Sequence, residues 1–134
     1  MTAPVVDAQP LIDAIKTAVT AAGVAIAEGR KPTVVAGKPY IVAFFDAGSV
    51  EDRSLRSRDG WSMVGSFQCA GLIPESARFA ARKLRAAVLG LHGQTFAGRT
   101  LQLPSHLGPL PMQRDDDADP PLFIQIDEWR LRLS

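Results

Sequence analysis

The chain has 134 residues, enough for one domain and too few for two, so we expect a single domain over residues 1–134. Its 15 basic and 14 acidic residues leave a formal net charge of +1, without the basic excess of a dedicated nucleic-acid-binding protein. Its single cysteine, Cys69, excludes a disulfide framework and indicates a reducing compartment. Apolar runs stay below the roughly 18 residues of a membrane span, and the first residues lack a signal-peptide pattern, so we expect synthesis in the cytoplasm and no membrane.

Two amphipathic helices are expected from apolar residues that recur at three- and four-residue spacing. The first covers residues 10–22, with a proline in its first turn and Gly23 directly after its end. The second covers residues 73–90 and has an alanine-rich inner face, which allows a helix to approach a sheet closely.

Three segments before the second helix have the composition of strands. Residues 24–29 predict a short strand, and residues 40–46, YIVAFFD, predict a strand with apolar side chains on both faces. A helix would cover one of those faces, and the other cover could be a second subunit. From Trp61 to Cys69 apolar and polar residues alternate, which indicates a strand with one buried face.

Residues 47–60 lie between two of these strands and are far longer than the usual hairpin connection of roughly two to five residues. They carry too few apolar side chains to fold alone. We interpret them either as a loose hairpin tip or as an extended arm whose mixed charges orient it on a symmetric neighbour. The residues assigned to this interface are Glu51, Asp52, Arg53, Leu55, Arg56 and Arg58.

The second predicted helix carries a stripe of positive charge. Arg78, Arg82 and Arg85 recur at i, i+4 and i+7 and therefore share one face. This face could contact phosphate or an acidic partner, and a merely solvated helix surface explains it equally well.

Residues 104–121 contain five prolines and four aspartates, which predicts an irregular loop. Three of the aspartates have the spacing that opens a calcium loop, but proline and isoleucine stand where that loop needs glycine and glutamate, so no metal is expected. We interpret Asp115, Asp116 and Asp117 as a solvated acidic segment that pairs with arginines, in this chain or on a neighbour.

The last predicted strand, residues 122–134, changes its apolar phase at Asp127. Before that residue the apolar side chains fall on one face, and after it they fall on the other. Either a bulge redirects the strand, or its two halves bury opposite faces against different partners.

The order of these elements indicates a mixed α+β domain, with two helices packed on one face of a mainly antiparallel mixed sheet and a long β-hairpin arm. The sequence contains no phosphate-binding glycine loop, nucleophile elbow or metal-ligand set, so we assign no catalytic residue, metal or cofactor. An enzyme would need a pocket that brings His92 or His106 close to Cys69.

Four segments, taken in order, resemble one family: PYIVAFFDAGSVEDR, SFQCAGLIPESARFAARKLRAAVLG, FAGRTLQL and QRDDDADPPLFIQIDEWRL. The ordered set is similar to tail terminator proteins of long-tailed phages and prophages, and most similar to those of actinobacterial phages. It covers roughly residues 8–134. Two features depart from the family: Ala70 stands where valine is frequent, and the arm is unusually rich in arginine.

The resemblance implies a structural, non-enzymatic virion protein made in the host cytoplasm. Family members form a ring, usually of six copies, on the last ring of the tail tube. That ring ends tube polymerisation and offers a surface to the head-completion or connector protein. Double-stranded DNA passes through the channel without sequence-specific binding. Asp115, Asp116 and Asp117 are then candidates for the channel lining or for charge pairing with Arg78, Arg82 and Arg85 between subunits.

Two other interpretations stay open. A head-completion or neck protein beneath the portal would also form a ring, with different neighbours. A small cytoplasmic binding domain without a phage role would be monomeric at micromolar concentration.

Overall fold

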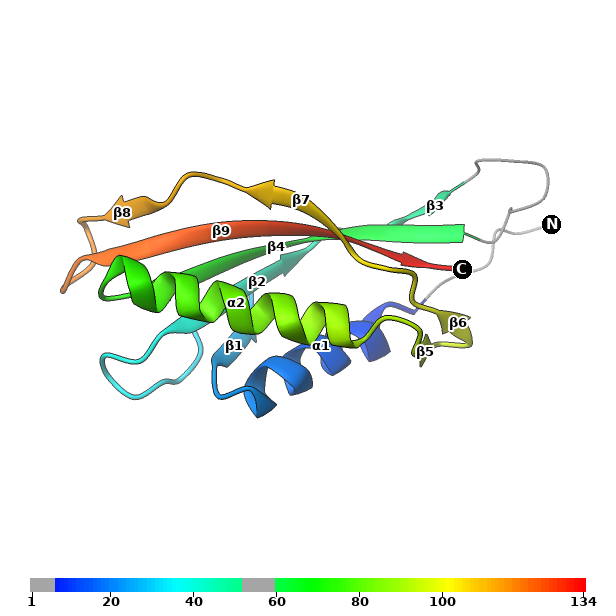
Figure 1. The fold of residues 1–134 in the computed structure, drawn as a ribbon, viewed down its shortest axis with the longest axis horizontal. Helices are drawn as coiled ribbons and strands as arrows, with labels where there is room; N and C mark the ends of the chain where they lie inside the picture. The colour runs from blue at the N-terminus through cyan, green and yellow to red at the C-terminus, as the bar shows by residue number, and fades with distance from the viewer. Residues whose placement is uncertain (1–6, 52–59) are drawn as a thin grey trace.

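The computed structural model describes residues 7–51 and 60–134. Its described residues form one large sheet, two helices and a small two-stranded hairpin (Figure 1). The expected α+β class is therefore confirmed: the sheet is mixed and mainly antiparallel, and both helices lie on the same side of it.

Five strand positions lie side by side in the sheet, in the order β1, β2, β4, β9, β7. The short strand β3 continues the position of β2 along β4, and β8 continues the position of β7 along β9. Only β1 and β2 pair in parallel, and every other pairing is antiparallel. The bounds are β1 Ala25–Glu28, β2 Tyr40–Phe45, β3 Ser49–Glu51, β4 Gly60–Gly71, β7 Ser105–Pro109, β8 Gln113–Asp115 and β9 Leu122–Leu133.

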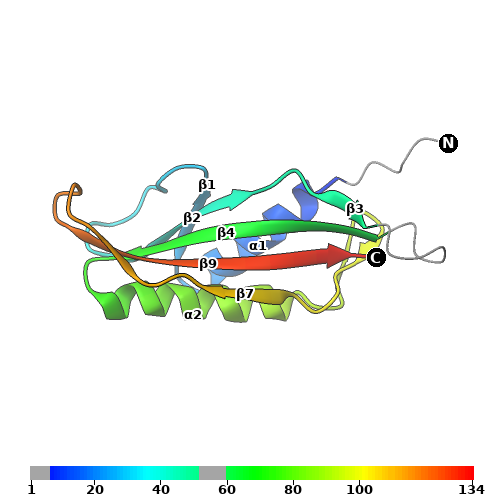
Figure 2. The same cartoon turned by 90° about the horizontal axis from the view of Figure 1, so that it is seen from above.

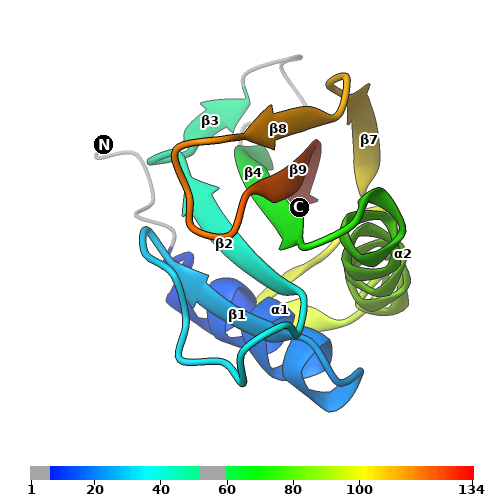
Figure 3. The same ribbon diagram turned by 90° about the vertical axis from the view of Figure 1, so that its left-hand side faces the viewer.

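The helices α1 (Gln9–Ala21) and α2 (Pro74–Gly90) cover a single face of this sheet. Figure 3 shows α1 under β1 and β2, and α2 beside β9 and β7. Helix α1 buries its leucine, isoleucine and valine side chains, whereas α2 buries small alanines together with Leu84 and Val88. Alanine on α2 lets this helix lie close to the strands, as its sequence predicts.

The long strands β4 and β9 form the centre of the sheet, in a register that runs unbroken from Trp61 opposite Leu133 to Gly71 opposite Phe123. Their inner face, the face toward the helices, holds most of the large core side chains. The alternation predicted for residues 61–69 is confirmed by this burial. The fully or almost fully buried side chains on this face are Trp61, Met63, Phe67, Cys69, Trp129, Leu131 and Leu133.

The opposite face of the sheet, here called the outer face, carries no helix and faces the viewer in Figure 2. Strand β2 shows the contrast between the two faces: Ile41 and Ala43 are fully buried beneath the helices, while Phe44 on the outer face is 45% exposed. Of the apolar outer residues predicted for this strand, Phe44 is exposed, Val42 is half-buried and Tyr40 is buried in the single chain.

The phase change of the last strand is explained without a bulge in its pairing to β4. After Asp127 the apolar side chains point inward. Before it Leu122, Ile124 and Ile126 point to the outer face, where they are half-buried, and Phe123 alone points inward. The second of the two alternatives is therefore correct: the halves of β9 direct their apolar side chains to opposite faces.

The prediction of an irregular loop over residues 104–121 was wrong in part, because β7 and β8 lie inside this range. Both strands pair with β9, whose edge remains free after β4 has paired on its other side. Proline lacks a backbone N–H and is therefore confined to edge strands and bulges. The prolines fit here because β7 is an edge strand and its hydrogen bonding to β9 is interrupted by a register shift between His106 and Gly108. Residues 116–121 between β8 and β9 remain irregular.

Two other segments complete the fold. The hairpin of β5 (Thr95–Phe96) and β6 (Arg99–Thr100) follows α2, and its continuation at Leu101 bridges to Leu133. Strand β3 begins the predicted arm and ends at Glu51, opposite Gly60. The arm residues Asp52, Arg53, Leu55, Arg56 and Arg58 lie outside the described part of the chain.

Gly71 sits where β4 turns into α2, and we expect Gly71→Ala to destabilise the fold. A Cβ atom there would lie 2.6 Å from the Cβ of Ser76 and 2.9 Å from the backbone nitrogen of Ala77, which cannot move without displacing α2. The expected loss is about 1–3 kcal/mol of unfolding free energy in urea denaturation. Gly90→Ala is the control, since nothing lies within 4 Å of its Cβ position and alanine favours a helix. Equal stabilities of the two variants would contradict the close packing.

Candidate interaction surfaces

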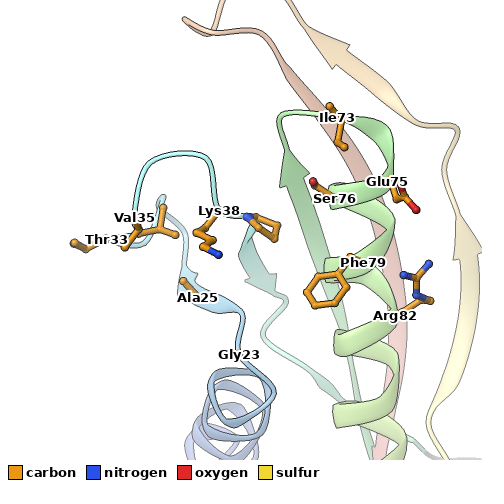
Figure 4. A pocket seen from close by; sticks show the side chains of 12 residues that line it. Gly23, Ala25, Thr33, Val35, Lys38, Ile73, Glu75, Ser76, Phe79 and Arg82 are labelled. Atoms are coloured by element: carbon orange, nitrogen blue, oxygen red, sulfur yellow. The ribbon is translucent and has the colours of Figure 1, made fainter.

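An apolar groove lies between the loop of residues 33–39 and the first turns of α2 (Figure 4). Its volume is about 720 Å³. Three large apolar side chains are exposed along it: Val35 at 73%, Ile73 at 53% and Phe79 at 38%. Lys38 and Arg82 add positive charge to the lining. Exposed apolar side chains gathered in one groove are typical of a surface that a partner covers.

The position of Ile73 follows from the start of α2. Ile73 is the N-cap residue, in an extended conformation with φ −130° and ψ 156°, and makes no side-chain hydrogen bond to the first turn. Helices favour serine, threonine, aspartate or asparagine at this position, because their oxygens accept a backbone N–H hydrogen bond. Ile73 therefore adds no capping hydrogen bond to the helix, and its exposed side chain contributes to the apolar lining of the groove.

The outer face of the sheet forms a second candidate surface. One row across it carries Val42, Gln68 and Ile126, and the neighbouring row carries Phe44, Ser66 and Glu128. Farther along β4 and β9 the outer residues are Ser62, Val64, Arg130 and Arg132, so this end of the face is mainly polar. The apolar end lies near β8 and the polar end near β3.

The predicted arginine stripe lines a second, smaller groove between α2 and the strands β7 and β9. This groove has a volume of about 300 Å³, and its floor contains Gln125 and Asp127 from the inner face of β9. These two polar residues of the inner face lie next to the arginines of α2, outside the hydrophobic core. We call this site the arginine groove; its lining residues are Arg78, Ala81, Arg82, Arg85, His106, Gln125 and Asp127.

Within the arginine groove, Asp127 is only 6% exposed. It accepts a hydrogen bond of 3.3 Å from the amide of Gln125, and its Oδ1 lies 3.8 Å from Nε2 of His106. The ring of His106 stacks on Trp129 with centroids 4.6 Å apart, and its buried Nε2 has no hydrogen-bond partner in the described structure. The three arginines are exposed and form no ion pair with any carboxylate of residues 7–51 and 60–134.

The acidic residues predicted as one cluster are divided by the structure. Asp115 accepts a hydrogen bond from the backbone N–H of Asp117, which fixes the turn after β8. Burial first, and the Asp115 carboxylate second, raise the pKa of Tyr40. Asp116 pairs with Arg114 at 2.6 Å, while Asp117 is exposed and has no ion pair within the described ranges.

The acidic turn and the arginine stripe do not meet within one chain. Figure 3 shows the turn between β8 and β9 on the side of β9 toward β2, with α2 and β7 on the other side. Pairing between Asp115, Asp116 or Asp117 and the arginines stays a prediction about neighbouring chains. Sequence reasoning missed the apolar groove, although the two apolar residues directly before Pro74 could have suggested it.

The chemistry of Cys69 does not resemble that of a nucleophile. The thiol is fully buried, opposite Gln125 in the sheet. Burial first, and the carboxylate of Asp127 second, raise the pKa of Cys69 far above its usual value, whereas reactive cysteines have a lowered pKa. Among the described residues no group of three or more His, Cys, Asp or Glu side chains could hold a metal ion. Neither described helix has the length and hydropathy needed to cross a bilayer.

Comparison with solved structures shows the fold in other proteins. A chain described as "Virion of native gene transfer agent (GTA) particle" is 18% identical, with a TM-score of 0.56; the match covers 94% of this chain and 96% of that one. A second solved chain is 11% identical, with a TM-score of 0.54 and coverage of 94% and 92%. No family model and no curated protein matches the sequence.

Because Cys69 is buried with a raised pKa, we expect its alkylation by iodoacetamide at pH 8 to be slow in the folded protein. In 6 M guanidinium the same thiol should react at the rate of a free cysteine, at least a hundredfold faster. The measurement is mass spectrometry of timed samples. Comparable rates in both states would contradict the packing of β4 against the helices.

Because Ile73 lacks a capping oxygen, we expect Ile73→Ser to raise the unfolding free energy by about 0.5–1 kcal/mol. Ile73→Ala removes the same apolar side chain without adding a cap and serves as the matched control. Urea denaturation compares the two. A serine variant less stable than wild type would show that Ile73 serves the fold of the single chain, and a serine variant no more stable than the alanine variant would show that no cap forms.

Proposed function

We propose that this protein is a structural subunit of a phage or phage-like virion. The observation that supports this most directly is the fold, shared over 94% of the chain with a protein described as part of a gene transfer agent virion. The chemistry of the described residues points the same way, since the exposed sites are apolar or charged surfaces and the one thiol is buried with a raised pKa. Such surfaces suit assembly rather than catalysis.

Within this class we propose a tail terminator. The four sequence segments that resemble that family correspond to structural units. The first spans β2 and β3, the second joins the end of β4 to α2, the third runs from Phe96 of β5 through β6, and the fourth contains β8 and most of β9. A resemblance distributed in order over the fold supports common ancestry more strongly than one short motif would.

The proposed unit is a ring of copies, most simply six, that caps the tail tube and ends its polymerisation. The partners are other copies of the chain, the tail tube protein and the head-completion or connector protein, at the tail–neck region of the virion. Two features support such an assembly: an outer sheet face with Phe44 45% exposed, and an apolar groove along α2. Each leaves apolar surface in water that a neighbour would bury.

DNA would pass through the channel of this ring without specific contacts. A formal net charge of +1 suits that role, because many phosphate contacts would retain the DNA. Asp115, Asp116 and Asp117 remain candidates for its lining.

A head-completion protein beneath the portal is the second candidate, favoured by the same exposed surfaces. It would bind the portal side of the neck and leave free tail tubes unchanged. A small binding domain without a phage role would stay monomeric over the whole concentration range.

The proposed function is tested by adding the purified protein to polymerising tail tubes and measuring tube length by electron microscopy. We expect a ring at one tube end and an end to growth. Tubes that lengthen as without the protein would contradict the tail terminator role, and a monomer at every concentration would contradict the ring.

The arm is tested by deleting residues 50–58 and measuring ring mass by mass photometry. If the arm reaches a neighbouring subunit or the tube, we expect loss of ring formation or of capping. The control keeps the arm length but replaces Arg53, Arg56 and Arg58 by serine, which separates the effect of charge from that of reach. Unchanged assembly and capping by the deletion variant would exclude the arm as a contact.

A further inference from the structure

The arginine groove has more positive charge than the chain itself neutralises. Arg78, Arg82 and Arg85 face one carboxylate, Asp127, which is buried at the floor and lies within 4 Å of none of their nitrogens. Like charges three and four residues apart on a helix repel each other. A bound anion would therefore stabilise the arrangement.

The anion must fit a small site. A groove of about 300 Å³ accommodates a few side chains of a partner at a time. Guanidinium groups bind carboxylates through two parallel hydrogen bonds, which suits a short acidic turn.

The chain carries such a turn after β8. Arg114 neutralises Asp116, but Asp117 and Asp119 are exposed and have no ion pair among residues 7–51 and 60–134. The hydrogen bond from the Asp117 N–H to Asp115 holds the turn in shape, so less conformational entropy is lost when the turn binds.

The two sites lie on different sides of the molecule, as Figure 3 shows, so a chain cannot satisfy its own groove. We propose that the acidic turn of one copy binds the arginine groove of the next copy. Two different patches that complement each other give a head-to-tail contact, and such contacts close into rings when the rotation between copies permits. This proposal rests on the proposed ring and names its subunit contact.

Apolar side chains beside the acidic turn support the same pairing. Val35 and Leu72 are exposed beside Asp119 in a hollow of about 640 Å³ next to the turn. The turn patch thus combines charge, which sets orientation, with apolar surface, which contributes affinity.

Charge reversal tests the contact. The groove variant carries Arg78→Glu and Arg85→Glu, two residues that line the arginine groove but not the apolar groove, and the turn variant carries Asp117→Lys and Asp119→Lys. We expect each alone to raise the concentration at half-assembly at least tenfold, measured by mass photometry and sedimentation velocity. In wild type, raising the salt from 50 to 500 mM should weaken assembly in the same direction. The control variant, Lys16→Glu with Arg30→Glu, changes the charge equally on α1 and the loop after β1 and should assemble as wild type.

Mixing gives the decisive result. An equimolar mixture of groove and turn variants should assemble again, with the variants alternating, because each contact then joins opposite charges. A misfolded variant could not be rescued in this way, and circular dichroism of each variant checks its fold independently.

Several results would overturn the proposal. Wild-type assembly that tolerates both reversals would exclude this contact and leave the tail terminator function standing. A loss in the groove variant alone would indicate a different acidic partner. Binding of a 20-base-pair duplex that the groove variant loses, with assembly intact, would assign the groove to phosphate. A wild-type chain that never assembles, with or without tubes, would exclude both the contact and the ring.

Discussion

The sheet is covered by helices on one face only, and the surfaces of the protein follow from this constraint. Helices α1 and α2 bury the inner side chains of β2, β4 and β9, and the central pairing of β4 with β9 keeps those side chains in register. On the outer face of the same strands Tyr40 and Ala70 are buried, whereas Val42, Phe44 and Ile126 stay partly or largely exposed in the described chain. In a strand with apolar side chains on both faces, such as β2, the domain itself buries the inner side chains fully and the outer ones only in part.

The charge pattern has a similar origin. Strand β9 points Gln125 and Asp127 inward at its middle, and Trp129, Leu131 and Leu133 inward after them. The core therefore ends partway along β9, and beyond that point α2 and β9 enclose a charged groove instead of a hydrophobic contact. One change of phase in twelve residues thus places apolar side chains on the outer face and a carboxylate beneath three arginines.

Much of this arrangement could be predicted from the sequence, because it depends on local periodicity. The limits of α2, the alternation of residues 61–69 and the shared face of the three arginines are all set by spacing along one element. The strands β7 and β8 could not be predicted in this way. They form because β9 offers a free edge, and that partner lies elsewhere in the sequence. The apolar groove was missed for a related reason, since it arises where a loop before β2 meets the start of α2.

The position of β9 also determines how the chain folds. Three strands pair with β9, and the nearest part of β4 precedes it by about fifty residues. The pairing of β4 with β9 therefore closes a long loop, which costs conformational entropy before the contact is made. Contacts between distant segments slow folding relative to helical bundles of similar size. During translation the first seventy-odd residues contain both β2 and β4 but lack the strand that covers the far edge of β4. Until residues 122–133 are available, the edge of β4 that pairs with β9 therefore stays open to pairing with other strands.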